Sequence, residues 1–290
     1  MNSNAKKGIA AFAALQILVF HCWIPVFGYV SALGNAERFL IAATYSGVDL
    51  FFFISAYSLA SRPVENYTAF IKNRTIKLMP LFIIALVFGH FLWFIPSIMI
   101  LYLVFPPLFK LCRKRPVISF FLLLAGWAAI TFLILGVIKP RQDIGIFLFR
   151  IPSMILGAYA PFVWNRIPKW LRLAGGIMLF AAGLILAYRF GYLHRLNVPF
   201  KGTFYLTGIP MMLGSALLID LISEKKHFRL AELFGSASLE IYFTQVVFGT
   251  LIVGAFFDLT GSRILTNISS FTAVFGISLL IQAFEDRFLY

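Results

Sequence analysis

"LQILVFHCWIPVFG", residues 15–28, lies inside the first long apolar run of this chain, which extends from Gly8 to about Val30. About 20 apolar residues are enough for a helix to cross a bilayer. The run exceeds the roughly 7 to 15 apolar residues of a signal peptide, and it contains Gln16 and His21. It therefore predicts a retained transmembrane helix, and it raises the question of why a histidine stands in a segment suited to hydrocarbon.

The whole chain has the composition of a membrane protein. Of its 290 residues, 61% are hydrophobic and only 12% are charged, and the mean hydropathy is +0.90. No polar stretch reaches the roughly 50 residues that a separate domain needs. We therefore predict one all-α integral membrane domain over residues 1–290, a bundle of about ten transmembrane helices. The predicted spans lie near residues 8–30, 42–61, 78–92, 93–111, 117–138, 144–163, 171–189, 203–223, 234–257 and 266–284.

The distribution of charge predicts the orientation. The net charge is +14, and alternating the spans from Lys6 and Lys7 on the inside places most of the 25 Lys and Arg residues in cytosolic segments. This bias follows the positive-inside rule, so both termini are predicted to be cytosolic. Basic side chains at such positions meet anionic lipid headgroups, so membrane lipids are expected partners and nucleic acid is not.

The number of crossings within residues 78–111 stays open. Basic clusters flank this segment at both ends, so it crosses an even number of times if both clusters are cytosolic. Two short tilted helices with a turn near Gly89 and His90 meet this condition, and so does a re-entrant hairpin. A single long tilted helix is the third alternative, and it would invert every later segment.

Three ionisable residues on different predicted helices would share one depth in the outer part of the bilayer: His21, Asp49 and Arg150. Ionisable groups in lipid are costly, so each is a functional hypothesis. An imidazole can take a proton from a hydroxyl and return it, and the Asp49 carboxylate could fix its tautomer. In the alternative, Arg150 pairs with Asp49 in a purely structural salt bridge, and His21 has no orienting partner.

A second group of residues is basic and is predicted to be cytosolic. "FIKNRTIKLMP", residues 70–80, places Lys72, Arg74 and Lys77 at the mouth of the third span. Arg74 and Lys77 are three apart and share a helical face, which suits a ligand that carries phosphates. Ordinary positive-inside anchoring explains the same cluster without a ligand.

A third group lies in "FGSASLEIYFTQVVF", residues 234–248. Ser238, Tyr242 and Gln245 fall on one side of a helix, where they line a polar seam or simply bond across helices. The sequence contains no Cys or His pairs at metal spacing, no glycine-rich phosphate loop and no serine elbow. We therefore expect no metal and no permanently bound cofactor.

Several stretches together resemble the acyltransferase 3 family of multi-span membrane O-acyltransferases. They occur in the family's order and cover essentially the whole chain. The matching pieces are "ALQILVFH" (14–21), "SGVDLFFFISAYSLA" (46–60), "NRTIKLMP" (73–80), "LWFIPSIMILYLVFPPL" (92–108), "RIPSMILGAYA" (150–160) and "FGSASLEIYFTQ" (234–245).

This resemblance implies a ten-helix fold that uses a cytosolic acyl-CoA, commonly acetyl-CoA, to acylate a hydroxyl of a sugar or glycan. The acceptor would be a cell-surface or lipid-linked glycan at the plasma membrane of a bacterium. His21 would match the family's catalytic histidine, and Arg74 with Lys77 would occupy the Arg-x-x-Arg positions near the donor. Asp49 and Ser55 would belong to the second-helix motif, and Tyr242 would match the aromatic residue of the ninth-helix motif.

The chain also departs from the family's pattern. The family usually has an arginine about three helical turns before the histidine, where this chain has Ala10 and Ala11. Lys77 stands for the second arginine of the donor pair, Ala56 replaces the glycine after Ser55, and Gln245 replaces a late histidine.

The leading hypothesis is a membrane O-acyltransferase in which CoA phosphates dock at the basic cluster and the pantetheine arm threads the bundle toward His21. His21 would deprotonate the acceptor hydroxyl, Asp49 would orient the imidazole, and Arg150 or a hydroxyl would stabilise the oxyanion. The donor-binding candidates are Lys72, Arg74 and Lys77, and the substrate-binding candidates are Ser55, Tyr242 and Gln245. The alternative is a transporter or flippase for a glycan or lipid-linked substrate, with the three ionisable groups lining its path. The oligomeric state stays open.

Overall fold

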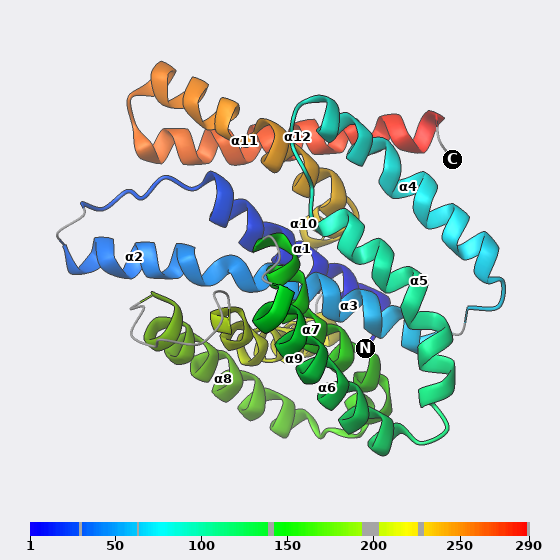
Figure 1. Ribbon diagram of the computed structural model, residues 1–290. Helices are drawn as coiled ribbons and strands as arrows, with labels where there is room; N and C mark the ends of the chain where they lie inside the picture. The colour runs from blue at the N-terminus through cyan, green and yellow to red at the C-terminus, as the bar shows by residue number, and fades with distance from the viewer. Residues whose placement is uncertain (29–30, 63, 139–141, 193–202, 226–228, 289–290) are drawn as a thin grey trace.

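The computed structural model describes residues 1–28, 31–62, 64–138, 142–192, 203–225 and 229–288 (Figure 1). Within these ranges all regular structure is helical, which confirms the predicted all-α class. The α-helices are α1 Ser3–Cys22, α2 Ala32–Ala43, α3 Gly47–Ser61, α4 Tyr67–Val87, α5 Phe94–Cys112, α6 Pro116–Leu133, α7 Gln142–Val163, α8 Lys169–Leu186, α9 Gly208–Lys225, α10 Arg229–Ser236, α11 Ser238–Thr260 and α12 Arg263–Phe288.

The prediction of ten spans is confirmed in part. Each predicted span falls on a helix, but among the described residues only eight segments are long and apolar enough to cross a membrane. The eight are residues 3–22, 32–61, 116–138, 144–166, 169–189, 205–224, 238–260 and 263–287. The two remaining segments are α4, whose first half is polar and basic, and α5, whose apolar part from Phe94 to Lys110 is shorter.

The alternative of one long helix through residues 78–111 is wrong. α4 ends at Val87, and the chain then turns at Gly89, which has a φ of +78° that side-chain-bearing residues rarely adopt. α5 begins at Phe94 and runs back beside α4, as Figure 1 shows in cyan and teal. The segment therefore forms two helices with a turn near Gly89, which is one of the arrangements expected from the sequence.

A helix also forms where the sequence analysis placed an external connection before the second span. α2 occupies residues 32–43 and continues into α3 through one 3-10 turn, Thr44–Ser46. Ser31 caps α2 by accepting a hydrogen bond from the Gly34 amide at 2.9 Å. Glu37 on α2 holds the chain that follows α1, because its carboxylate accepts bonds from the Trp23 indole and the Val26 amide.

The chain begins and ends at the same end of the bundle. The Met1 amine lies 3.3 Å from the side-chain oxygen of Asn165, just after α7, and α12 brings Glu285 against Glu240 in the first turn of α11. We call this the basic end, because its helix termini carry most of the described Lys and Arg residues: Lys6, Lys7, Arg62, Arg74, Lys77, Lys110, Arg113, Lys114, Arg115, Arg166, Lys169 and Arg172. That this end faces the cytosol stays a prediction.

The candidate site is positioned by close packing of α3 against α7. A Cβ on Gly157 of α7 would come within 2.2 Å of the Phe53 carbonyl oxygen of α3, so only glycine allows this approach. α3 also packs on α1, where a Cβ on Gly47 would come within 2.7 Å of the Ala13 carbonyl oxygen. Figure 1 shows α3 at the centre of the bundle, with α8 and α9 below it and α11 and α12 as an antiparallel pair above it.

Candidate functional site

Asp49 and Arg150 form a buried ion pair between α3 and α7. Their side chains are 0% and 2% exposed, and one guanidinium nitrogen of Arg150 bonds one carboxylate oxygen of Asp49. Ser153 donates to the other oxygen of Asp49 at 2.7 Å. A second nitrogen of Arg150 donates to the Tyr45 carbonyl at 3.1 Å. The carboxylate is therefore satisfied by its neighbours on α7.

Aromatic rings complete the surroundings of Arg150. The guanidinium carbon lies 4.6 Å from the centroid of the Tyr205 ring and 5.5 Å from that of Tyr45. Such cation–π contacts favour a cation that has been removed from water. Arg150 therefore sits in a closed cage whose other charge is Asp49, the arrangement that the sequence left open as a structural salt bridge.

His21 is separate from this pair. It lies in the last turn of α1, it is exposed, and its closest ring neighbour is Phe20 at 5.1 Å between centroids. Within the described ranges its imidazole makes no hydrogen bond and no ion pair. Gly47 stands against Ala13, eight residues before His21, so the histidine lies about 12 Å further along α1 at 1.5 Å per residue.

The common depth expected for the three ionisable groups is therefore not what the structure has. Asp49 and Arg150 share a level, and His21 lies about two turns beyond them. Arg150 and Ser153 each bond one oxygen of Asp49, and the carboxylate does not orient the imidazole in this structure. The proposed catalytic roles of His21, Asp49 and Arg150 stay predictions.

A cavity of about 830 Å³ opens at the basic end, between the start of α1, the end of α3 and the start of α4. Its lining includes three cationic side chains: Lys6, Arg62 and Arg74. Glu65 is the one acidic residue in the lining. A volume of this size falls within the range of small-molecule and cofactor sites.

Arg74 lines this cavity and is held there by two aromatic rings. Its guanidinium carbon lies 5.2 Å from the centroid of the Tyr102 ring and 5.4 Å from that of Phe70. Among the described residues no carboxylate comes within ion-pair distance of it. The aromatic rings hold the guanidinium while its charge remains available to an anionic ligand.

A second cavity of about 220 Å³ adjoins the first one and leads toward the interior. Ser55, Arg74 and Tyr102 line both cavities. Lys77, Ser238 and Tyr242 line the inner cavity only, and Tyr242 is 7% exposed. The structure thus brings together donor-binding and substrate-binding candidates that are far apart in the sequence.

Two of the donor-binding and substrate-binding candidates lie outside these cavities. Lys72 is exposed and lines neither of them, because it points away from the face of α4 that carries Arg74. Gln245 is 3% exposed, and neither its amide nitrogen nor its oxygen has a hydrogen-bond partner among the described residues. Gln245 lies one turn beyond Tyr242 on α11, so it continues the polar line that starts at Ser238.

His21 lines neither cavity, and a layer of apolar side chains lies between. Ile17 belongs to the same buried apolar cluster as Phe94 and Tyr242, which lie at the inner cavity. His21 is four residues after Ile17 on the same face of α1, or about 6 Å further along the axis. Among the described residues, the two cavities that Arg74 lines therefore do not reach the imidazole.

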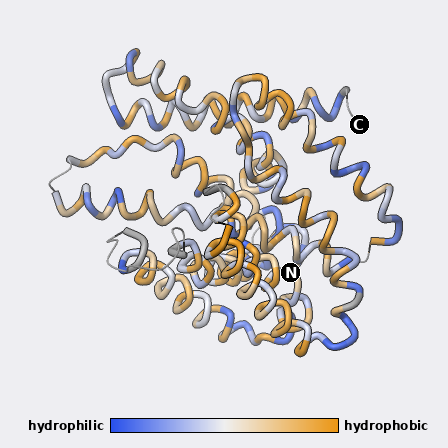
Figure 2. Tube along the Cα trace, in the orientation of Figure 1, coloured by the Kyte–Doolittle hydropathy of each residue, from blue (hydrophilic) through white to orange (hydrophobic). Residues whose placement is uncertain are grey.

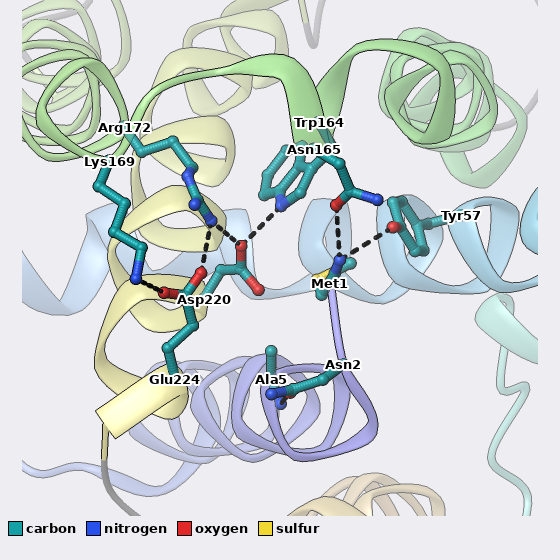
Figure 3. A network of polar contacts seen from close by, with 10 residues as sticks. All are labelled: Met1, Asn2, Ala5, Tyr57, Trp164, Asn165, Lys169, Arg172, Asp220 and Glu224. Carbon is teal, nitrogen blue, oxygen red and sulfur yellow. Dashed lines mark hydrogen bonds and ion pairs between the residues drawn. The ribbon is translucent and has the colours of Figure 1, made fainter.

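A further polar network lies at the basic end of the bundle (Figure 3). Asp220 of α9 accepts hydrogen bonds from the Trp164 indole at 2.8 Å and from Arg172 of α8 at 2.9 Å. Arg172 also pairs with Glu224 at 2.9 Å, and Lys169 pairs with Glu224 at 2.8 Å. These contacts fix α8 to α9 and to the turn that follows α7.

Several residues of the cavities, the ion pair and the polar network were not predicted from the sequence. Tyr102 holds Arg74, Ser153 and Tyr45 hold the ion pair, and Asp220 pairs with Arg172. Of these residues, only Asp220 and Arg172 could have been found in the sequence, because an acidic and a basic residue in apolar segments predict an ion pair.

Within the described ranges no group of three or more metal-ligating side chains is close enough to hold a metal ion.

The comparison with known families fits this arrangement. A model of the acyltransferase 3 family, described as an acyltransferase domain, matches residues 86–283. The chain belongs to the acyltransferase 3 family. This is a family of membrane acyltransferases, so the resemblance noted in the sequence is confirmed and the chain is an acyl-transferring enzyme. No curated protein and no solved structure matches the sequence.

The matched segment of this acyltransferase divides the candidate residues. Arg150, Tyr242 and Gln245 lie inside it, whereas His21, Arg74 and the rest of the first four helices lie largely before it. The transporter alternative loses its basis, since the chain has an acyltransferase domain and the Asp49–Arg150 pair is closed to solvent.

Proposed function

We propose that this acyltransferase moves an acyl group, such as acetyl, from cytosolic acyl-CoA to a hydroxyl of a cell-surface or lipid-linked glycan. The observation that carries the proposal is Arg74: its guanidinium has no acidic partner among the described residues, and it lines a cavity of about 830 Å³ at the basic end of the bundle.

The charges around this cavity support a donor that carries phosphates. Lys6 and Arg62 lie in the same lining as Arg74, and Glu65 offsets only one of the three positive charges. Arginine binds phosphate through two parallel hydrogen bonds, and lysine acts as a point charge. Lys77 would add a further cation at the inner cavity, where the pantetheine arm would enter.

The path of the arm is inferred from the residues that line the two cavities. From Arg74 and Ser55, which line both cavities, it would extend toward Tyr242, which lines the inner cavity only. The thioester would then have to cross the apolar layer at Ile17 to meet His21. We therefore expect this layer to open when the donor binds.

In the proposed reaction, His21 takes the proton from the acceptor hydroxyl as the oxygen attacks the thioester carbonyl. The new C–O bond forms, the C–S bond breaks, and the proton passes from the imidazole to the departing CoA thiolate. The exposure of His21 supports this role, because an acceptor can reach the imidazole from the end of the bundle opposite the basic end.

His21→Ala tests the proposal, with His90→Ala as the matched control at a histidine in the turn between α4 and α5. In cells that lack the wild-type gene, we expect His21→Ala to lower glycan acylation by at least a hundredfold. His90→Ala should retain it, and both purified variants should bind acyl-CoA normally. Normal acylation by His21→Ala at an equal protein level would refute the catalytic role.

A further inference from the structure

α6 packs mainly against α7. The Ser119 and Tyr159 hydroxyls lie 2.7 Å apart, and the Trp127 indole donates to the Leu148 carbonyl at 2.7 Å. Thr131 is the one buried residue within the described part of α6. The helix packs less extensively on α5 than on α7.

An apolar groove of about 340 Å³ occupies the space between α5, α6 and α7. Its wall on α5 runs from Ile100 to Leu108, about 12 Å at 1.5 Å per residue. Gly126 and Trp127 belong to its wall on α6, and the remaining lining side chains are aliphatic, Phe or Met. These dimensions and this chemistry suit a hydrocarbon chain.

A cavity of about 540 Å³ adjoins the groove at the basic end. Phe105 lines both spaces, so they lie against the same ring. The second cavity is walled by Pro106, Pro107 and Phe109 near Phe105, and its lining also includes Tyr67, Lys110 and Arg113. The apolar groove therefore lies next to a cavity with two cationic side chains.

These two cations have no partner in the part of the chain that the structure describes. Lys110 and Arg113 are three residues apart at the end of α5, and both are exposed. Glu65 lines the opposite wall but forms no ion pair with either of them. Figure 2 shows hydrophilic residues at the turn between α5 and α6 and hydrophobic residues along both helices.

We propose that this composite site binds one anionic glycerophospholipid of the surrounding leaflet. Its phosphate would lie between Lys110 and Arg113, and one of its acyl chains would follow Phe105 into the groove between α5, α6 and α7. Basic residues at the ends of transmembrane helices attract anionic headgroups. The adjoining apolar groove distinguishes this site from general electrostatic attraction to the surface, because the groove also binds an acyl chain of the lipid.

The proposal does not depend on the identity of the acyl donor. The cavity at Lys110 shares Leu59, Val64 and Glu65 with the cavity at Arg74, so the bound lipid would form part of the wall beside the donor. A lipid is favoured over a soluble anion, because a soluble anion would use the two cations and leave the groove empty.

The headgroup contact is tested by comparing Lys110→Gln/Arg113→Gln with Lys114→Gln/Arg115→Gln. The two double variants remove the same charge, but Lys114 and Arg115 line neither space. Dioleoyl phosphatidylglycerol and dioleoyl phosphatidylcholine are titrated into the purified full-length protein in detergent, and bound lipid is read by native mass spectrometry. We expect the first variant to lose roughly tenfold in preference for phosphatidylglycerol, and the second to keep it. Equal losses in both variants would overturn the site.

The contact between the lipid acyl chain and the groove is tested by Gly126→Leu, with Gly254→Leu as the control. A Cβ on either glycine meets no atom within 4 Å, so both variants should fold, but only Gly126 lines the groove. Gly126→Leu should weaken binding of phosphatidylglycerol, and Gly254→Leu should not. Unchanged binding in Gly126→Leu would overturn the proposal. So would competition by inorganic phosphate at the affinity of the lipid, or displacement of the lipid by acetyl-CoA.

Discussion

Arg150 and Arg74 are two arginines with opposite surroundings. Arg150 is 2% exposed, bonds Asp49 and the Tyr45 carbonyl, and is covered by aromatic rings. Arg74 is exposed, lies over the rings of Phe70 and Tyr102, has no carboxylate partner among the described residues, and lines a cavity. A guanidinium neutralised inside the protein belongs to the framework, whereas one held by rings and left without an acid offers its charge to a ligand.

The largest effect expected from this comparison is the loss of Asp49. Asp49→Ala would leave the Arg150 charge buried and unpaired, which costs about 3–5 kcal/mol of stability. The midpoint of thermal unfolding in detergent should fall steeply. Asp49→Ala/Arg150→Met should recover much of the loss, because the charge is then absent. A single variant as stable as the wild type would show that the pair is not structural.

Arg172 provides a second buried pair with a smaller expected effect. Arg172→Gln leaves Asp220, which is 2% exposed, with the Trp164 indole as its remaining partner. We expect a loss of about 2–3 kcal/mol, because one hydrogen bond to the carboxylate persists. The unfolding midpoint in detergent measures it. A loss as large as that of Asp49→Ala would mean that the indole contributes nothing.

The exposed arginine should behave in the opposite way. Arg74→Ala is expected to leave the unfolding midpoint nearly unchanged and to weaken acyl-CoA binding by about tenfold or more, since it removes a charge-assisted bond to phosphate. Lys72→Ala, two residues earlier and outside the cavity lining, is the control. Isothermal titration with acetyl-CoA measures both variants. If the two variants weakened acyl-CoA binding equally, the basic cluster would act only through its general positive charge.

The smallest effect is expected for Lys169, whose side chain is 70% exposed and pairs with Glu224. Exposed ion pairs contribute little, so Lys169→Gln should cost less than about 0.5 kcal/mol. Measuring Lys169→Gln beside Arg172→Gln compares the stability contributions of two cations that share Glu224 and differ mainly in burial. Similar losses in the two variants would mean that burial does not decide the contribution.

Much of the fold could be predicted from the sequence, because apolar length and basic flanks are strong signals in membrane proteins. Each predicted span falls on a helix, and the turn at Gly89 was among the expected arrangements. α2 was missed because its Asn35, Glu37 and Arg38 interrupt the apolar run. Glu37 is tolerated there because the Trp23 indole and two backbone amides satisfy it, which no local pattern reveals.

The two residues of the buried pair could be singled out from the sequence, but not their arrangement. Asp49 and Arg150 were both recognised as costly in lipid, but which of Arg150 and His21 would meet Asp49 depends on the packing of α3 on α7. A common depth was predicted for all three residues because positions within predicted spans do not show how one helix is shifted along another. Tyr102 has no sequence signal of its own, because one tyrosine in an apolar helix resembles ordinary packing.

The contact of Gly157 with the Phe53 carbonyl bears on how a substrate enters and leaves. We expect helices this close, also joined by the Asp49–Arg150 pair, to move as one rigid body. α4 has only three buried residues, Leu78, Leu81 and Ala85, among its described side chains, and it is joined to α5 by the turn at Gly89. Exchange of a large donor would thus rely on a hinge motion of α4 and α5 against a fixed α3–α7 unit.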